Sequence, residues 1–156
     1  MNDEDFMRLA IEKAREGIAE GQTPFGACMV KNGHVVACEH NRVWQTTDST
    51  AHAEVVAIRN ACEALGTIDL SGCVMYATCE PCPMCFSACH WARISRIVYG
   101  AEIEDALNAG FNELTIPNPE MKELGNSPVE LRPGVLREEC AALFAEWTEK
   151  RLTRKY

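Results

Sequence analysis

The chain has 156 residues, of which 47% are hydrophobic and 24% charged, an ordinary globular composition that excludes an intrinsically disordered protein. Its formal net charge of −8 disfavours general attraction to nucleic acid, because phosphate contacts need lysine and arginine. The N-terminus lacks a secretion signal and no apolar run is long enough for a membrane span. We therefore expect one domain over residues 1–156, cytoplasmic and without a membrane partner.

Helical and strand patterns alternate along the chain. Residues 4–20 carry apolar side chains at helical spacing, and Asn32-Gly33 suits the type I′ turn of a β-hairpin. Such alternation predicts a sheet layered between helices. The predicted order is helix 4–20, strands 26–31 and 34–39, loop 40–50, helix 52–65, strand 73–78, helix 83–92, strand 96–101, helix 102–108, loop 111–128, strand 129–132 and helix 134–152.

The nine cysteines are an odd number in a chain without an export signal, so a disulfide framework is not expected. Free cysteine also serves as a small buried apolar residue. We expect that role for the cysteines outside the motifs described next, namely Cys28, Cys38, Cys62, Cys73, Cys89 and Cys140.

Two cysteines at the start of a predicted helix form half of a metal site. In the segment PCPMC, Cys82 and Cys85 are three residues apart on one helical face, and the partial positive charge of a helix N-terminus favours thiolates. His52 begins another predicted helix and is the natural third ligand. Three protein ligands in a tetrahedral zinc shell leave one position for water, as in catalytic sites. We therefore predict one Zn²⁺ per chain, bound by His52, Cys82 and Cys85.

Glu54 follows His52 by two residues, and at a helix start both side chains can project into the same cavity. Zinc lowers the pKa of bound water toward about 7. A carboxylate beside that water can take its proton and return it to a leaving amine. His-x-Glu followed by Pro-Cys-x-x-Cys is a signature of zinc nucleobase deaminases, so Glu54 is the predicted catalytic acid and base.

Other interpretations of these motifs explain less of the pattern. A Cys-x-x-Cys pair alone also occurs in thioredoxin-like redox sites, and a four-cysteine structural zinc site would need Cys79 and Cys89. A zinc-stabilised interaction module without catalysis needs the metal ligands but no carboxylate such as Glu54. The carboxylate therefore favours the enzyme.

The segments TAHAEVVAIRNA and YATCEPCPMCFSACHWARISRIVYGA resemble the cytidine and deoxycytidylate deaminase superfamily, and the resemblance spans nearly the whole chain. Within it, TPFGACMVK, EHNRV, WAR, AGFNEL and the terminal Tyr156 are most similar to bacterial guanine deaminases. This resemblance implies a three-layer α/β/α sandwich with a central mixed sheet of about five strands. It also implies a homodimer that can exchange its C-terminal segments, and zinc-dependent hydrolysis of guanine to xanthine and ammonia.

The same resemblance implies a purine pocket with aromatic walls and a polar group that reads the ring. An aromatic side chain can stack on a base, and a carboxylate can accept hydrogen bonds from a ring N–H and an exocyclic amine. The candidate carboxylate, Glu113, departs from the aspartate expected at that position in the family. The implied walls are Phe25 and Trp91, the group that reads the purine is Glu113 or Asn112, and Asn41, Ala53 and Tyr156 complete the set.

A second resemblance concerns the substrate. CEPCPMC, RIVYGA and PGVLREECAALFAEW are also similar to bacterial tRNA-specific adenosine deaminases. The acidic net charge, the Phe in TPFGA, the WAR segment and the lack of an extended basic tail favour a small purine over tRNA. Guanosine or another nucleoside stays an alternative substrate.

Overall fold

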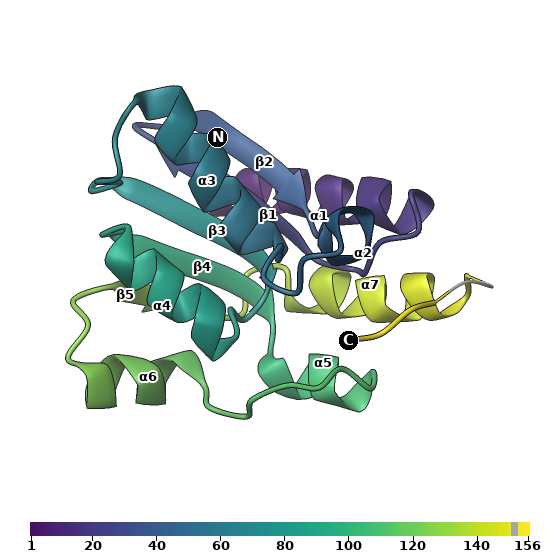
Figure 1. Cartoon of the computed structure of the whole chain (residues 1–156). Helices are drawn as coiled ribbons and strands as arrows, with labels where there is room; N and C mark the ends of the chain where they lie inside the picture. Colours follow the sequence, from purple (N-terminus) through teal and green to yellow (C-terminus); the bar gives the residue numbers. More distant parts are fainter. Residues whose placement is uncertain (151–152) are drawn as a thin grey trace.

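The computed structural model describes residues 1–150 and 153–156 (Figure 1). Helices lie on both sides of a central sheet. Within the described residues no helix combines the length and the apolar character needed to cross a membrane. In chain order the elements are α1 (Asp3–Ala19), β1 (Gly26–Lys31), β2 (His34–His40), α2 (Val43–Thr46), α3 (Ala53–Leu65), β3 (Cys73–Cys79), α4 (Pro83–Trp91), β4 (Arg96–Ala101), α5 (Ile103–Asn108), α6 (Asn118–Gly125), β5 (Glu130–Arg132) and α7 (Arg137–Thr148).

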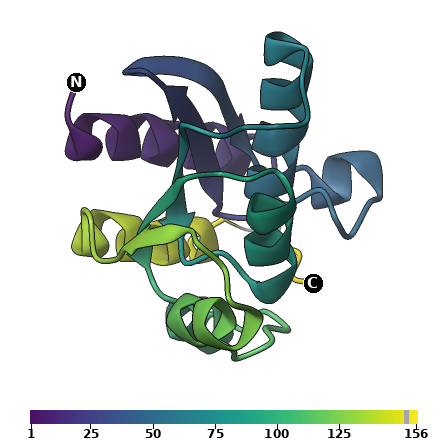
Figure 2. The same ribbon diagram turned by 90° about the vertical axis from the view of Figure 1, so that its left-hand side faces the viewer.

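The sheet is mixed and has the strand order β2-β1-β3-β4-β5. β1 is antiparallel to both β2 and β3, whereas β3, β4 and β5 run parallel to one another. Figure 2 shows α1 and α7 on one side of the sheet and α3 and α4 on the other. The predicted three-layer α/β/α sandwich with a five-stranded mixed sheet is confirmed.

Strand residues alternate between the two helical layers, as the pleat of a β-strand requires. On β3, Tyr76 packs with α1 and α7, whereas Met75 and Ala77 pack with α3 and α4. Because β2 and β3 are both antiparallel to β1, they run in the same direction. Their carboxyl ends therefore lie at the same end of the sheet, the edge at which these strands terminate. The chain leaves these two ends toward α3 and α4, so the starts of both helices lie at that edge.

Local sequence signals account for most of the boundaries in the first half of the chain. Asn2 caps α1 through a capping box with Asp5. Asn32 and Gly33 both have positive φ in the turn between β1 and β2. Gly66 ends α3 in the left-handed conformation. The predicted hairpin and the two helices around it are confirmed.

The structure differs from the predictions in two loops and at the last helix. The predicted loop 40–50 contains α2, and the predicted loop 111–128 contains α6. Pro119 lies in the first turn of α6, where its missing N–H costs nothing, so this proline starts a helix instead of preventing one. The last helix begins after Leu136, which has positive φ, and ends at Thr148, while residues 151–152 of the prediction lie outside the described residues.

The C-terminal helix α7 packs against α1 and β4 of its own chain. Apolar side chains of α7, including Leu143 and Trp147, are buried in the core on that side of the sheet. The homodimer and the exchange of C-terminal segments between subunits stay predictions.

Asp3 ties the start of α1 to three strands. Its carboxylate accepts hydrogen bonds from the Tyr76 hydroxyl on β3 (2.6 Å) and the Arg96 guanidinium on β4 (3.0 Å), and it pairs with Arg132 on β5. Burial opposes ionisation, but the Tyr76 hydrogen bond and the two arginine charges outweigh it and lower the pKa of Asp3. The ionised carboxylate therefore stabilises the folded state.

We predict that Asp3→Asn lowers the free energy of unfolding by roughly 2 kcal/mol at neutral pH, because hydrogen bonds to charged groups contribute about 1.5–3 kcal/mol. The folded pKa lies below the unfolded value of about 3.9, so the carboxylate's contribution is present above that value and is lost as the pH falls through the folded pKa. Urea unfolding of both proteins, at neutral pH and in acid, measures the difference. It should shrink in acid, and a difference independent of pH would contradict this role.

Candidate active site

The starts of α3 and α4 present three metal-ligand side chains to one point. His52 is the N-cap of α3 and Cys82 is the N-cap of α4, and neither side chain makes a capping hydrogen bond. N-cap residues have extended backbone and project past the end of the coil, so both side chains are free to turn toward each other. Cys85 follows three residues after Cys82, on the same face of α4.

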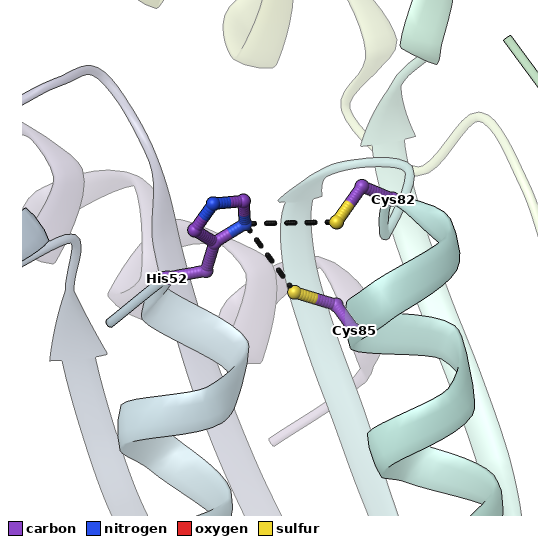
Figure 3. Close-up of side chains that lie close together, drawn as sticks. All are labelled: His52, Cys82 and Cys85. Atoms are coloured by element: carbon purple, nitrogen blue, oxygen red, sulfur yellow. Dashed lines mark hydrogen bonds between the residues drawn. The ribbon is translucent and has the colours of Figure 1, made fainter. Parts of the chain in front are cut away.

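His52, Cys82 and Cys85 have the separations of a tetrahedral metal shell (Figure 3). The Nδ1 atom of His52 lies 3.6 Å from the Cys82 Sγ and 3.5 Å from the Cys85 Sγ, and the three donor atoms all lie within 4.8 Å of one another. Zinc bonds of about 2.3 Å to sulfur and about 2.0 Å to nitrogen, at the tetrahedral angle, place nitrogen and sulfur about 3.5 Å apart. The three donor atoms therefore fit Zn²⁺.

Cys79 and Cys89 do not join this group. The Cys79 thiol donates to the main-chain oxygen of Glu102 (3.4 Å), and Cys89 is fully buried between α4 and the sheet. In the part of the chain that the structure describes, only the His52 group brings three such side chains close enough to share an ion. The alternative of a four-cysteine structural site therefore has no support.

The surroundings favour a thiolate at Cys82 and a titratable carboxyl at Glu54. Hydrogen bonds from Cys85 and His52 outweigh burial and lower the pKa of Cys82 to about 4. Glu54 lies in the first turn of α3, and its burial raises its pKa to about 7. A carboxyl with a pKa near neutrality can both accept and return a proton at physiological pH.

His52, Glu54 and Cys82 line a small cavity at this edge of the sheet. The cavity volume is about 20 Å³, which is close to the space that one water molecule needs. Its remaining walls are Phe25, Cys79, Glu80, Glu113 and Tyr156.

The match to a protein family identifies the reaction for which these cavity residues are used. Residues 1–101 match the cytidine and deoxycytidylate deaminase zinc-binding region. The chain belongs to this family. It is therefore a zinc-binding deaminase that acts by hydrolysis, and the predicted zinc cofactor is confirmed.

Relatives of two specificities resemble this deaminase. The guanine deaminase of Bacillus subtilis (strain 168) is 48% identical over 114 residues, which cover 72% of this chain and 73% of the relative. The tRNA-specific adenosine deaminase of the same organism is 39% identical over 153 residues, covering 96% of this chain and 92% of the relative. A solved structure of the guanine deaminase from Nitrosomonas europaea has a TM-score of 0.87 at 32% identity, covering 94% of this chain and 85% of that chain.

The side chains of Asn41 and Tyr156 form a hydrogen bond beside the cavity of the deaminase. Asn41 follows β2 and is fully buried, and its side-chain amide donates to the Tyr156 hydroxyl (2.5 Å), while its side-chain oxygen accepts from the Val43 main-chain N–H (3.0 Å). The Tyr156 ring lies 5.3 Å from the His52 ring. The main-chain oxygen of Tyr156 accepts from the Asn112 N–H (3.0 Å). The C-terminal residue thus forms one wall of the cavity.

Phe25 and Glu113 also reach the cavity, whereas Ala53 and Asn112 do not line it. The Phe25 ring lines the cavity and packs edge-on against the Phe111 ring, 5.0 Å between centroids. The Ala53 methyl group is buried in the core between α3 and the sheet. Asn112 is exposed and contacts Tyr156 through its main chain. Glu113 and Asn112 are the two candidates for hydrogen bonding to the purine ring, and of these only Glu113 lines the cavity.

Trp91, which the resemblance implied as a wall of the pocket, does not line this cavity in the part of the chain that the structure describes, and its role in binding stays a prediction. α4 begins at the metal ligands and Trp91 is the last of its nine residues, so about 13 Å of helix rise separates Trp91 from Cys82. Trp91 is 82% exposed and lines a different groove, together with Ile68 and Arg93. The helix predicted over residues 83–92 starts at the metal ligands, so the sequence pattern also placed Trp91 at the opposite end of that helix.

Glu80 is a residue that the sequence motifs did not single out, yet it holds the segment that carries Glu113. Its buried carboxylate accepts from the main-chain N–H groups of Ile103 (3.2 Å) and Asn118 (2.7 Å), near the two ends of that segment. The Asn118 side-chain amide also donates to the Pro81 main-chain oxygen (2.6 Å). The segment is thereby fastened beside the metal ligands. The one available signal was an acidic residue directly after a buried strand.

We predict that Cys82→Ser loses bound zinc and lowers the thermal stability of the protein, because removal of one ligand opens the shell and metal binding is coupled to folding. Elemental analysis of the purified proteins and thermal unfolding measure both effects. Cys89→Ala is the matched control, since Cys89 is buried in the same helix and should keep about one zinc per chain. Full zinc content in Cys82→Ser would contradict the ligand assignment.

Proposed function

We propose that this deaminase acts on a small purine and hydrolyses guanine to xanthine and ammonia. The observation that carries the proposal is the carboxylate of Glu113, which lines the same cavity as Glu54 and Cys82. Guanine presents a ring N–H and an exocyclic amine side by side, and one carboxylate can accept hydrogen bonds from both. Adenine presents an unprotonated ring nitrogen beside its amine, so an ionised carboxylate would face an acceptor. Burial raises the pKa of Glu113 to about 7, so the ionised form that discriminates prevails above neutral pH. A buried polar group that stays unpaired disfavours the wrong substrate.

In this proposal His52, Cys82 and Cys85 hold the zinc ion. When bound, zinc lowers the pKa of a water molecule toward about 7 and so supplies the nucleophile at neutral pH. The Glu54 carboxylate would accept a proton from the attacking water and deliver it to the amine as ammonia leaves. Its burial beside the ligands keeps the carboxyl close to the reacting atoms and away from bulk solvent.

The remaining cavity walls orient the ring. Phe25 is fixed by its aromatic neighbours and offers a flat apolar surface, and the buried Asn41 amide holds the Tyr156 hydroxyl beside the cavity. The cavity of about 20 Å³ is far smaller than the roughly 300 Å³ or more of common small-ligand sites. We therefore propose that Tyr156 shifts when the base enters and then closes over it. Tyr156 is placed to do so, because it is a wall of the cavity and its ring lies 5.3 Å from the His52 ring.

Adenosine in tRNA is the second candidate substrate. The match to a tRNA-specific adenosine deaminase over 96% of this chain favours it. The net charge of −8 opposes it, because binding of a polynucleotide depends on neutralising its phosphates. Glu113 also disfavours adenosine, because its ionised carboxylate would face the unprotonated ring nitrogen of the adenine base.

A substrate panel tests the proposal. The zinc-loaded protein is incubated with guanine, guanosine, adenine and an adenosine-bearing tRNA anticodon stem-loop, and ammonia and inosine are measured. We expect guanine to be the preferred substrate. Turnover of the stem-loop alone would overturn the guanine assignment.

Glu54→Gln should keep its zinc and lose turnover by about 100- to 10,000-fold, the usual contribution of general acid–base catalysis. Full activity of Glu54→Gln would overturn the proton-transfer role.

Glu113→Gln should reduce kcat/KM for guanine by about 10- to 100-fold, because hydrogen bonds to a charged acceptor contribute about 1.5–3 kcal/mol each. Zinc content should not change, since Glu113 is not among the metal-ligand group. Glu120→Gln is the matched control, because Glu120 is exposed on α6 and outside the cavity. Equal kinetics of the two variants would remove Glu113 from the substrate site.

A further inference from the structure

Cys28 and Cys38 lie directly opposite each other on neighbouring strands. Cys28 is on β1 and Cys38 is on β2, and the two residues are Cα partners in the antiparallel register. Both lie on the face of the sheet that packs against α1. The sequence motifs gave these two residues no role beyond that of small apolar side chains.

The pairing between β1 and β2 brings the two cysteines within disulfide distance. The Asn41 main-chain N–H donates to the Phe25 oxygen (3.1 Å), so these opposite residues form a hydrogen-bonded pair. Hydrogen-bonded and non-hydrogen-bonded pairs alternate along an antiparallel ladder, and the register is regular as far as Met29. Cys28 and Cys38 therefore form a non-hydrogen-bonded pair, in which Cα atoms lie about 4.5 Å apart. Disulfides span Cα separations of about 4.4–6.8 Å.

The two thiols also differ in the way that thiol–disulfide chemistry requires. Cys28 is fully buried, whereas Cys38 is half-buried, and the Cys38 thiol donates to the Leu9 main-chain oxygen (3.6 Å). The neighbouring Cys28 thiol and the charge of Lys13 outweigh the effect of burial and lower the pKa of Cys38. Cys38 is thus the more accessible and more acidic thiol, and Cys28 is placed behind it.

We propose that Cys28 and Cys38 are a reversible modification site, which a low-molecular-weight disulfide such as glutathione disulfide converts to a cross-strand disulfide. The Cys38 thiolate attacks one sulfur of the reagent, the S–S bond of the reagent breaks, and one glutathione thiolate leaves. The Cys28 thiol then attacks the Cys38 sulfur, the bond between Cys38 and glutathione breaks, and the glutathione thiolate leaves with the proton of the Cys28 thiol. Two protein thiols are oxidised and one reagent disulfide is reduced to two thiols.

This site is separate from the zinc ligands. The cross-link would join the two strands three residues away from Phe25 on one strand and three residues away from Asn41 on the other. Phe25 lines the cavity, and Asn41 holds the Tyr156 hydroxyl beside it. The zinc-bound cysteines lie instead at the start of α4. Oxidation of the pair therefore leaves the metal-ligand group intact.

Peptide mapping tests the proposal on the zinc-loaded protein. Samples equilibrated in glutathione buffers with an increasing share of the disulfide are quenched in acid, alkylated with N-ethylmaleimide and digested with trypsin without reductant. Lys31 lies between the two cysteines, so the peptides Glu16–Lys31 and Asn32–Arg42 each carry a single cysteine. We expect these peptides to become linked to each other as the disulfide share rises and to separate again with dithiothreitol, at unchanged zinc content.

Two single variants distinguish the steps. Cys28→Ser should leave Cys38 bearing one glutathione without a cross-link, whereas Cys38→Ser should leave Cys28 alkylated by N-ethylmaleimide. Both peptides alkylated separately in the most oxidising buffer would overturn the proposal. A cross-link that forms only in urea would overturn it equally, because it would then belong to the unfolded chain.

Discussion

The starts of α3 and α4 meet at the edge of the sheet where β2 and β3 end, and the chemistry of this protein depends on that meeting. The strand order places the two helix starts side by side, and the two N-cap side chains, His52 and Cys82, turn toward each other instead of capping their helices. The positive ends of two helix dipoles and a bound cation then offset the cost of burying thiolates and a carboxylate together. Without the metal, Glu54 and Cys82 would repel each other in a cavity of about 20 Å³. This makes zinc part of the fold as well as of the reaction.

The sequence was sufficient for the parts of the molecule that depend on local spacing. Asn32-Gly33, Gly66 and the Pro-Cys-Pro segment each act within a few residues, so they predicted the hairpin, the end of α3 and the start of α4. The metal ligands could be predicted from local spacing as well, because each of them lies at the start of a predicted helix. The α6 helix was missed because proline marks both loops and first helical turns, and only the surrounding contacts of Asn118 distinguish the two.

The rest of the pocket depends on tertiary contacts that no local pattern encodes. Trp91 follows the metal motif closely in sequence, yet one short helix carries it away from the cavity. Glu113 and Tyr156 are distant in sequence and reach the cavity because other groups hold their segments, among them the Glu80 carboxylate and the Asn41 amide. Substrate preference therefore rests on how the segment after α5 is fastened, whereas the reaction type rests on the helix starts. Cys28 and Cys38 acquire their chemistry in the same non-local way, through strand register.

Zinc K-edge X-ray absorption of the zinc-loaded protein tests the central claim most directly, because it counts the sulfur ligands. If the two helix starts alone supply the metal shell, the spectrum will show two sulfurs at about 2.3 Å and two lighter donors at about 2.0 Å, one of them the His52 nitrogen and the other water. A shell of three or four sulfurs would bring Cys79 or Cys89 onto the metal. That result would contradict a hydrolytic centre with an open position and would indicate a closed structural site.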